Sequence, residues 1–188
     1  MSVIDKKTLR RDLLRKRLSL SNTLVSLKSQ AITNHLLAIA RIREKNNFSC
    51  YLSINNEVDT TIIIDSLIQK GVNIFVPTYS KTTNNYQFSR FGGWQDLEEG
   101  PQRILQPKDT YIIDPSLIGV AILPGLAFSK EGVRLGYGKG VFDRLLAGST
   151  ALKIGLAYEF QIIDGNIPKE KHDLLMDLIV TEKKVYRF

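Results

Sequence analysis

The sequence predicts an α/β fold, an open three-layer sandwich built around a mostly parallel sheet. Apolar stretches of strand length alternate along the chain with amphipathic stretches of helical length. Residues 119–123 are apolar almost without interruption, as expected when both faces of a parallel sheet are covered. Between residues 48 and 78, a strand, a helix and a strand follow one another at the length of a right-handed crossover. The pattern is therefore Rossmann-like.

Two amphipathic helices are expected before the first strand. Leu9, Leu13, Leu14 and Leu18 recur at helical spacing and predict a helix over residues 5–18. Ser21 is a suitable N-cap for a second helix that is predicted to run to about Ile42. The elements expected next are a strand at 48–54, a helix at 60–70 capped by Asp59 and ended by Gly71, and strands at 72–78 and 86–91.

The second half of the chain is expected to hold fewer regular elements. Prolines restrict residues 95–118 to loops and short pieces. The apolar strand at 119–123 leads into a glycine-rich loop at 124–140 and then into a helix that begins near Val141. The remaining strands are predicted at 153–157 and 178–181, and the latter is expected to be the last.

Length and composition exclude several classes of protein. The 188 residues suit a single domain over residues 1–188, and 43% of them are hydrophobic, which is enough for a proper core. No apolar run approaches the roughly 20 residues that span a bilayer, and no secretory apolar stretch follows the N-terminus. The single cysteine, Cys50, fits a reducing compartment or is neutral on the question. We expect a cytoplasmic monomer or weak dimer without membrane contact.

The net charge of +7 is concentrated near the N-terminus. Such a concentration serves nucleic acid, a membrane surface or a phosphorylated small molecule, or is simply a solvated helix face. Two acidic residues interrupt the segment, which disfavours an organellar transit peptide. The basic residues among the first twenty are Lys6, Lys7, Arg10, Arg11, Arg15, Lys16 and Arg17.

The strongest chemical signal is the glycine-rich loop that follows the apolar strand. Alternating glycines at 136, 138 and 140 let the backbone approach a ligand closely, and successive N–H groups form an anion-binding nest. The next helix is expected to point its positive dipole end at the same place. Arg134 and Lys139 add positive charge, and Asp143 suits Mg²⁺. The spacing matches neither a Walker A loop nor the dinucleotide fingerprint. Its position after a buried strand favours phosphate binding over a flexible surface turn.

Four motifs in the expected order, covering nearly the whole chain, resemble those of the 5-formyltetrahydrofolate cyclo-ligase (5,10-methenyltetrahydrofolate synthetase) family. The matching segments are Lys6–Arg10 with Arg17, Tyr51–Thr60, Pro124–Arg144, and the tail segments Ile154–Gln161, Ile167–Asp173 and Ile179–Glu182. Two positions depart from the family pattern, because Ser129 stands where an acidic residue is usual and Val141 where an aromatic one is usual. Neither departure removes a charge expected to bind phosphate or metal.

The resemblance implies an ATP- and Mg²⁺-dependent ring closure. In that reaction the formyl oxygen of 5-formyltetrahydrofolate attacks the γ-phosphate of ATP. N10 then attacks the phosphorylated carbon, and phosphate leaves to give 5,10-methenyltetrahydrofolate. The resemblance assigns ATP binding to Lys6, Lys7, Thr8, Leu9, Arg10, Arg134, Leu135, Gly136, Tyr137, Gly138, Lys139, Gly140, Val141 and Phe142.

The same resemblance distributes the remaining roles. Lys139 and Arg134 are the expected catalytic cations, and Asp143 and Asp173 the expected Mg²⁺ ligands, with Asp177 a weaker candidate. The folate is expected to contact Leu52, Glu57, Trp94 and Tyr137, with Glu57 accepting from pterin N–H groups. Trp94 and Tyr137 are equally well interpreted as packing aromatics, and His172 is interpreted as structural rather than catalytic.

Three other functions compete with this interpretation. A basic nucleic-acid-binding protein would explain the N-terminal charge, but the chain has no aromatic and basic residues interleaved on a strand and no zinc or helix-turn-helix pattern. A folate-binding relative without turnover would be expected to have lost Lys139, Arg134 or Asp143, and all three are present. A sugar-phosphate isomerase on a related scaffold rests on fold analogy alone.

Overall fold

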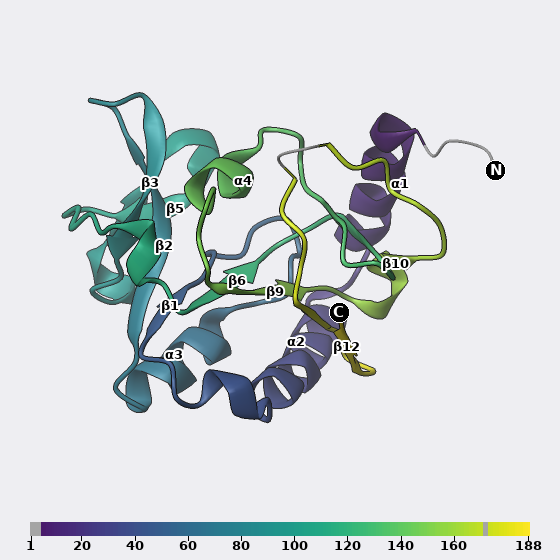
Figure 1. Cartoon of the computed structure of the whole chain (residues 1–188), viewed down its shortest axis with the longest axis horizontal. Helices are drawn as coiled ribbons and strands as arrows, with labels where there is room; N and C mark the ends of the chain where they lie inside the picture. The colour runs from purple at the N-terminus through teal and green to yellow at the C-terminus, as the bar shows by residue number, and fades with distance from the viewer. Residues whose placement is uncertain (1–4, 171–172) are drawn as a thin grey trace.

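The computed structural model describes residues 5–170 and 173–188, and a seven-stranded sheet forms its centre (Figure 1). The strands are ordered β12-β11-β9-β6-β1-β2-β3. The five inner strands run parallel, and each outer strand pairs antiparallel with its neighbour. The strands are β1 (Asn47–Ser49), β2 (Asn73–Ser80), β3 (Asn85–Arg90), β6 (Val120–Leu123), β9 (Leu152–Leu156), β11 (Leu178–Val180) and β12 (Val185–Arg187).

The strand order confirms the predicted Rossmann-like arrangement. From β1 the chain proceeds outward to β2 and β3, and it then returns to place β6 on the other side of β1. The connections that leave β1 and β6 therefore diverge in opposite directions. In open α/β sheets, this switch point leaves a crevice at the carboxyl ends of the two strands, and ligands bind there.

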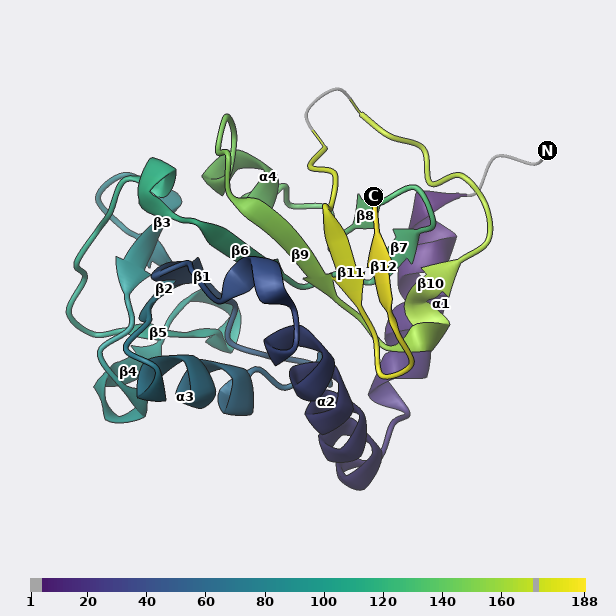
Figure 2. The same ribbon diagram turned by 60° about the horizontal axis from the view of Figure 1, so that its bottom comes forward.

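Helices cover both faces of the sheet, as the sandwich prediction requires (Figures 1 and 2). Helices α2 (Asn22–Leu37) and α3 (Thr61–Gln69) lie on one face, and α4 (Val141–Leu145) lies on the other. Val120 and Ile122 join the apolar cluster of α2 and α3, whereas Leu123 joins the cluster of α4. Every residue of β6 is buried, which explains its uninterrupted apolar sequence.

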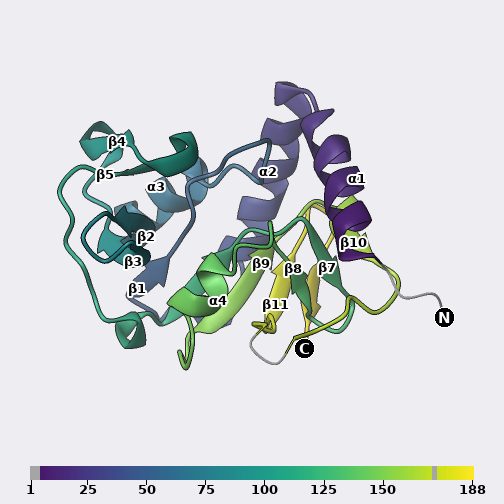
Figure 3. The same cartoon turned by 90° about the horizontal axis from the view of Figure 1, so that it is seen from above.

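Helix α1 (Lys6–Leu18) packs on a separate small sheet rather than on the main one (Figure 3). Asp5 caps it by accepting from the N–H groups of Lys7 and Thr8, as short polar N-caps do. Its Leu13 packs among apolar residues of the small sheet and the chain around it. The small sheet has the order β10-β7-β8, with β7 (Ala127–Ser129), β8 (Arg134–Leu135) and β10 (Ile162–Ile163).

The chain around β1 differs from the prediction in two ways. Ser21 caps α2 as expected, but the helix ends at Leu37, and a short 3₁₀ turn at Ala40–Ile42 follows. The strand predicted at 48–54 ends at Ser49. The next residues form a loop instead, because Glu57 accepts from the Ile54 N–H and the two asparagines between them adopt left-handed backbone conformations. Short polar side chains that bind local backbone groups compete with strand pairing in this way.

The remaining differences concern short elements. A hairpin of β4 (Leu97–Glu99) and β5 (Leu105–Pro107) occupies part of the proline-rich segment. Strands β7 and β8 divide the predicted glycine-rich loop at 124–140, which leaves a loop after β6 at 124–126 and, after β8, the alternating glycines at 136–140, for which the name glycine-rich loop is kept below. Strand β12 follows the strand that was expected to be the last. Asp59 does accept from the Thr61 N–H at the start of α3. The other 3₁₀ turns are Trp94–Asp96, Pro101–Arg103, Pro115–Leu117 and Glu159–Gln161. No helix within residues 5–170 and 173–188 is long and apolar enough to cross a membrane.

The packing of the Phe128 ring against Gly125 and Gly155 gives a test of the fold. A Cβ on Gly155 would lie 2.5 Å from Cε1 of Phe128, whose ring is fully buried. We therefore expect Gly155→Ala to lower the free energy of unfolding by about 1–3 kcal/mol, measured by urea denaturation. Adding Phe128→Leu should restore part of that loss, because the two sites share one space.

Gly119→Ala is the matched control, because a Cβ there meets the flexible end of the Lys45 side chain first, at 3.2 Å. Equal losses for the two alanine variants would contradict the packing described for Phe128.

Candidate active site

A cavity of about 450 Å³ opens at the switch point of the sheet. Its walls come from the loop after β1, the loop after β6, the glycine-rich loop and the N-terminal turns of α1. The lining residues are Lys6, Arg10, Tyr51, Leu52, Ile54, Asn55, Glu57, Pro77, Tyr86, Gln102, Ile104, Leu105, Pro124, Gly125, Arg134–Asp143, Glu170 and Asp173. The cavity therefore occupies the place where an open α/β sheet binds its ligand.

Most of the residues singled out from the sequence meet in this cavity. Lys6 and Arg10 line it together because they lie one helical turn apart on α1. Leu52, Glu57 and residues 134–143 also line it, as does Asp173. The sheet topology brings together the loops after β1 and β6, and the packing of α1 on the small sheet adds Lys6 and Arg10.

Several predicted site residues do not reach the cavity. Lys7, Thr8 and Leu9 lie outside its lining, and Leu9 packs against the small sheet instead. Asp177 is also absent from the lining and accepts from the Lys153 N–H. His172 lies outside the described residues.

Trp94 contacts Asp65 and Phe91 instead of the cavity. Its indole N–H donates to Oδ1 of Asp65 over 2.8 Å, and its ring meets Phe91 edge-on at 5.0 Å between centroids. It does not line the cavity. These contacts favour the interpretation of Trp94 as a packing aromatic, and its expected contact with the folate stays a prediction.

The glycine-rich loop is held against α1. Nε of Arg10 donates to the carbonyl of Gly136 over 2.9 Å, and the backbone φ angles of Gly138 and Gly140 are 95° and 59°. These left-handed conformations favour glycine at both positions. The helix that follows has only five residues, so the dipole expected from it is small. The positive charge of this wall therefore comes mainly from side chains.

Arg134 is fixed by a partly buried ion pair with Asp143. Nη2 of Arg134 lies 2.8 Å from Oδ2 of Asp143, and the two side chains are 6% and 14% exposed. The other carboxylate oxygen of Asp143 accepts from the Leu174 N–H, while Nη1 of Arg134 donates to the Pro124 carbonyl. Breaking such a pair is costly to the extent that it is shielded from water, because one charge is left without a partner. Asp143 therefore orients the Arg134 guanidinium.

Carboxylates also gather beside Asp143, because Asp173 precedes Leu174, whose N–H donates to Asp143. Nζ of Lys6 lies 3.2 Å from Oε1 of Glu170 and 3.8 Å from Oδ2 of Asp173. Within the described residues, no three His, Cys, Asp or Glu side chains form a cluster that could hold a metal. Mg²⁺ usually binds through one or two carboxylates together with waters and substrate phosphates. Asp173 and Asp143 thus fit a Mg²⁺ that a phosphate ligand brings, and they do not form a complete protein site.

Glu57 is buried at the base of the cavity, with 5% of its surface exposed. Its Oε2 accepts from the Ile54 N–H over 3.1 Å. Burial raises the pKa of this carboxyl to about 7, although the charge of Arg17 and hydrogen bonds from Ile54 and Tyr137 act in the opposite direction. Near neutral pH the carboxyl therefore exists in both states, and only the ionised state is purely an acceptor.

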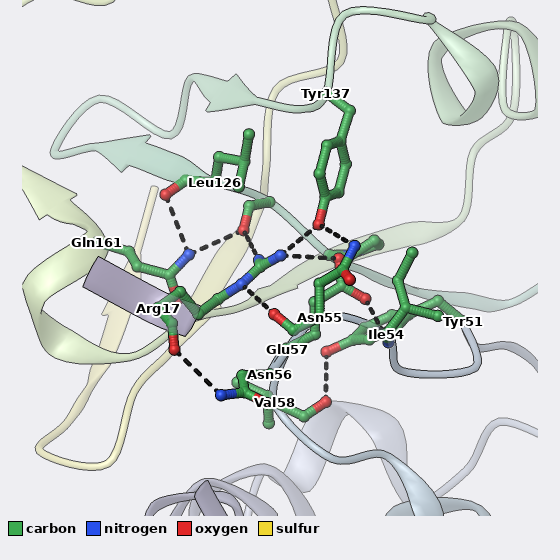
Figure 4. A network of polar contacts seen from close by, with 12 residues as sticks. Arg17, Tyr51, Ile54, Asn55, Asn56, Glu57, Val58, Leu126, Tyr137 and Gln161 are labelled. Atoms are coloured by element: carbon green, nitrogen blue, oxygen red, sulfur yellow. Dashed lines mark hydrogen bonds and ion pairs between the residues drawn. The ribbon is translucent and has the colours of Figure 1, made fainter. Parts of the chain in front are cut away.

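The burial of Arg17 is not predicted by the sequence, which places this residue among the basic residues of the helix surface. The residue is only 1% exposed. Its Nε donates to the Asn55 carbonyl over 3.0 Å, Nη1 to the Gly125 carbonyl over 3.2 Å, and Nη2 to the hydroxyl of Tyr137 (Figure 4). A usable signal was present, because Arg17 follows Leu13 by one helical turn on the face that packs inward.

Comparison with known proteins identifies the family to which this chain belongs. A model of the 5-formyltetrahydrofolate cyclo-ligase family matches residues 3–182. The chain belongs to this family. The resemblance inferred from the four sequence motifs is thereby confirmed.

Individual relatives agree with the family match. A Haemophilus influenzae 5-formyltetrahydrofolate cyclo-ligase is 30% identical over 158 residues, which cover 80% of this chain and 84% of the relative. The solved 5,10-methenyltetrahydrofolate synthetase of Aquifex aeolicus superposes with a TM-score of 0.86 at 31% identity, covering 97% of this chain and 92% of that one. The Mycoplasma pneumoniae synthetase gives 0.76 at 28% identity, covering 95% and 99%.

Two further features of this cyclo-ligase fold were not expected from the sequence. Nε2 of Gln161 donates to the carbonyls of Gly125 and Leu126, and it thereby fixes the turn after β6. One wall of the cavity also comes from the β2–β3 and β4–β5 regions. The residues of this wall are Pro77, Tyr86, Gln102, Ile104 and Leu105.

The raised pKa of Glu57 makes stability depend on pH. In the folded protein the carboxyl holds its proton up to about pH 7, whereas its ordinary pKa is 4.5. Its contribution to stability is therefore complete below pH 4.5 and is lost as the pH rises through 7. Relative to Glu57→Gln, the free energy of unfolding of the wild type should fall across this interval by roughly 3 kcal/mol.

Urea denaturation at several pH values measures this difference. Glu44→Gln, at an exposed position, is the control. A wild type that loses no stability relative to Glu57→Gln over this range would contradict the described burial of Glu57.

Proposed function

We propose that this chain converts 5-formyltetrahydrofolate to 5,10-methenyltetrahydrofolate, using ATP and Mg²⁺ and releasing ADP and phosphate. The observation that carries the proposal is that one cavity is lined both by cations of α1 and the glycine-rich loop and by the buried carboxyl of Glu57. The family match and the named relatives support it.

The proposed reaction has two steps. The formyl oxygen attacks the γ-phosphorus and ADP departs, which leaves a phosphorylated N5-iminium carbon. N10 then attacks that carbon and gives up its proton, and the C–O bond breaks so that phosphate leaves, with that proton balancing its release as hydrogenphosphate. Phosphorylation is needed because an amide-like oxygen is a poor leaving group. The task of the protein is chiefly positioning and charge stabilisation, so no nucleophilic serine or cysteine is required.

The phosphate side of the cavity is assigned to four cations. Lys6 and Arg10 reach it from α1, and the hydrogen bond of Arg10 to the Gly136 carbonyl limits its movement. Arg134 is held rigidly by Asp143. Lys139 lies on the exposed part of the loop and can follow the phosphoryl group as its charge redistributes.

The folate side is assigned to Leu52, Glu57 and Tyr137. An ionised Glu57 accepts from pterin N–H groups by charge-assisted hydrogen bonds. Tyr137 is 41% exposed as a residue while its hydroxyl is bound by Arg17, so the side chain remains available to a planar ligand. This residue stands between the two sides of the cavity and can contact both substrates.

Mg²⁺ would be held by Asp173 and Asp143 together with the phosphates. Bound there, it would neutralise charge on the transferring phosphoryl group. Asp143 also orients Arg134, because its Oδ2 accepts from Nη2 of Arg134. Its Oδ1 accepts from the Leu174 N–H, which holds the carboxylate in place. Asp173 accepts from the Glu170 N–H, which orients it at the rim.

A folate-binding protein without turnover is the alternative that the cavity alone would also accommodate. The full set of cations favours turnover, because its position beside the glycine-rich backbone suits a triphosphate. We further propose that the whole chain acts as a single catalytic domain. The cytoplasmic location and the monomeric or weakly dimeric state remain predictions.

Turnover tests the proposal directly. The purified chain, mixed with 5-formyltetrahydrofolate and Mg-ATP, should form 5,10-methenyltetrahydrofolate, seen by its near-ultraviolet absorbance. Lys139→Ala should lower kcat by about 10²–10³-fold, with a smaller rise in the KM for ATP, because Lys139 acts chiefly in the transition state.

Lys70→Ala, at an exposed lysine at the end of α3, is the matched control and should behave as the wild type. A folded wild type that binds folate but forms no product would favour the non-catalytic alternative. A large rise in KM with unchanged kcat would make Lys139 a ground-state binding residue instead.

A further inference from the structure

We propose that Arg17 is a positioning residue, which holds Glu57 and Tyr137 in place for the folate and joins the folate-binding loop to the glycine-rich loop. The inference rests on the proposed function for its substrate. Arg17 itself does not line the cavity, so it acts through the residues that do.

The first observation is the burial of a permanent charge. Arginine remains protonated in proteins, and a buried guanidinium is costly unless it is paired and hydrogen-bonded. Two of the bonds of Arg17 go to uncharged carbonyls, and a third goes to the Tyr137 hydroxyl. The nearby negative charge is Glu57, whose Oε1 lies 3.6 Å from Nη2. Arg17 and Glu57 therefore stabilise one another.

The second observation is that one guanidinium connects three loops that meet at the switch point (Figure 4). Asn55 belongs to the loop after β1, Gly125 to the loop after β6, and Tyr137 to the glycine-rich loop. The loop after β1 also binds back to α1, because Nδ2 of Asn56 donates to the main-chain carbonyls of Arg17 and Leu20. The planar fork of arginine can serve these separate acceptors together, whereas the single ammonium of lysine cannot.

The third observation concerns the groups around Glu57. Tyr51 donates to the Val58 carbonyl, and Tyr158 donates to the main-chain carbonyl of Glu57. Burial raises the pKa of Tyr51 well above its usual range and that of Tyr158 to about 12, so both stay neutral. Arg17 supplies the positive charge that favours the ionised state of Glu57. Removing that charge should therefore leave Glu57 protonated at higher pH.

The fourth observation links Arg17 to Tyr137. The Tyr137 oxygen accepts from Arg17, and Nδ2 of Asn55 approaches it at 3.5 Å. A phenol that accepts in this way keeps its own proton for another acceptor, and a hydrogen bond from Tyr137 lowers the pKa of Glu57. Arg17 thus sets both the orientation of the phenol and the charge of the carboxyl.

Three variants test the proposal. Arg17→Lys keeps the charge but loses the fork, Arg17→Met loses both, and Arg15→Met removes an exposed charge from the same helix as a control. We expect the Kd for 5-formyltetrahydrofolate, measured by calorimetry without nucleotide, to rise at least about tenfold in Arg17→Lys and further in Arg17→Met. Arg15→Met should bind as the wild type does.

A second measurement separates positioning from a purely structural role. Carbon-13 NMR of the Glu57 carboxyl reports its titration without any substrate. In Arg17→Met the titration should move to higher pH, whereas in Arg17→Lys it should stay near that of the wild type. If Arg17→Met does not fold, the raised Kd of a folded Arg17→Lys carries the test.

Two results would overturn the proposal. In one, folded Arg17 variants bind folate as tightly as Arg15→Met does, with only a lower melting temperature. In the other, the Glu57 titration of folded Arg17→Met is unchanged. A wild type that does not bind 5-formyltetrahydrofolate would overturn the proposed function instead, and the NMR titration would still decide whether Arg17 controls Glu57.

Discussion

The cavity depends on a positive charge buried where the connections of the sheet diverge. A Rossmann-like topology opens a crevice between the loops that follow β1 and β6, but it does not by itself fix those loops. Arg17 does so from α1, by bonding to the Asn55 and Gly125 carbonyls and to the Tyr137 hydroxyl. Helix α1 can deliver this side chain because the small sheet holds it beside the main one. The N-terminal helix is therefore part of the site and not an appendage.

The two ends of the cavity differ in chemistry, and this difference supports the proposed reaction. One end gathers cations that are held by hydrogen bonds or ion pairs, as Arg10 is by Gly136 and Arg134 by Asp143. The other end presents a buried carboxyl with a raised pKa. A phosphate and a ring with N–H donors are complementary to these two ends respectively. Tyr137 belongs to the glycine-rich loop, and its hydroxyl accepts from Arg17, the partner of Glu57, so it connects the two groups.

The sequence predicted what depends on long-range pattern and failed where local or tertiary contacts decide. The all-buried strand at 120–123 and the alternating glycines are strong signals, since each reflects one physical requirement over several residues. The loop after Ser49 was mistaken for a strand, because its shape depends on the bond between Glu57 and the Ile54 N–H. The sequence around Trp94 does not distinguish a packing aromatic from a ligand-binding one. Strands of two or three residues are too short to show periodicity.

Hydrogen exchange with each ligand alone tests the central claim, that one cavity holds folate at the Glu57 end and nucleotide at the glycine-rich loop. 5-formyltetrahydrofolate should slow amide exchange in residues 52–57. Mg²⁺ with a non-hydrolysable ATP analogue should slow it in residues 134–142 and in the first turns of α1. Protection by the nucleotide away from residues 134–142, or by the folate away from residues 52–57, would contradict the assignment of the two ends.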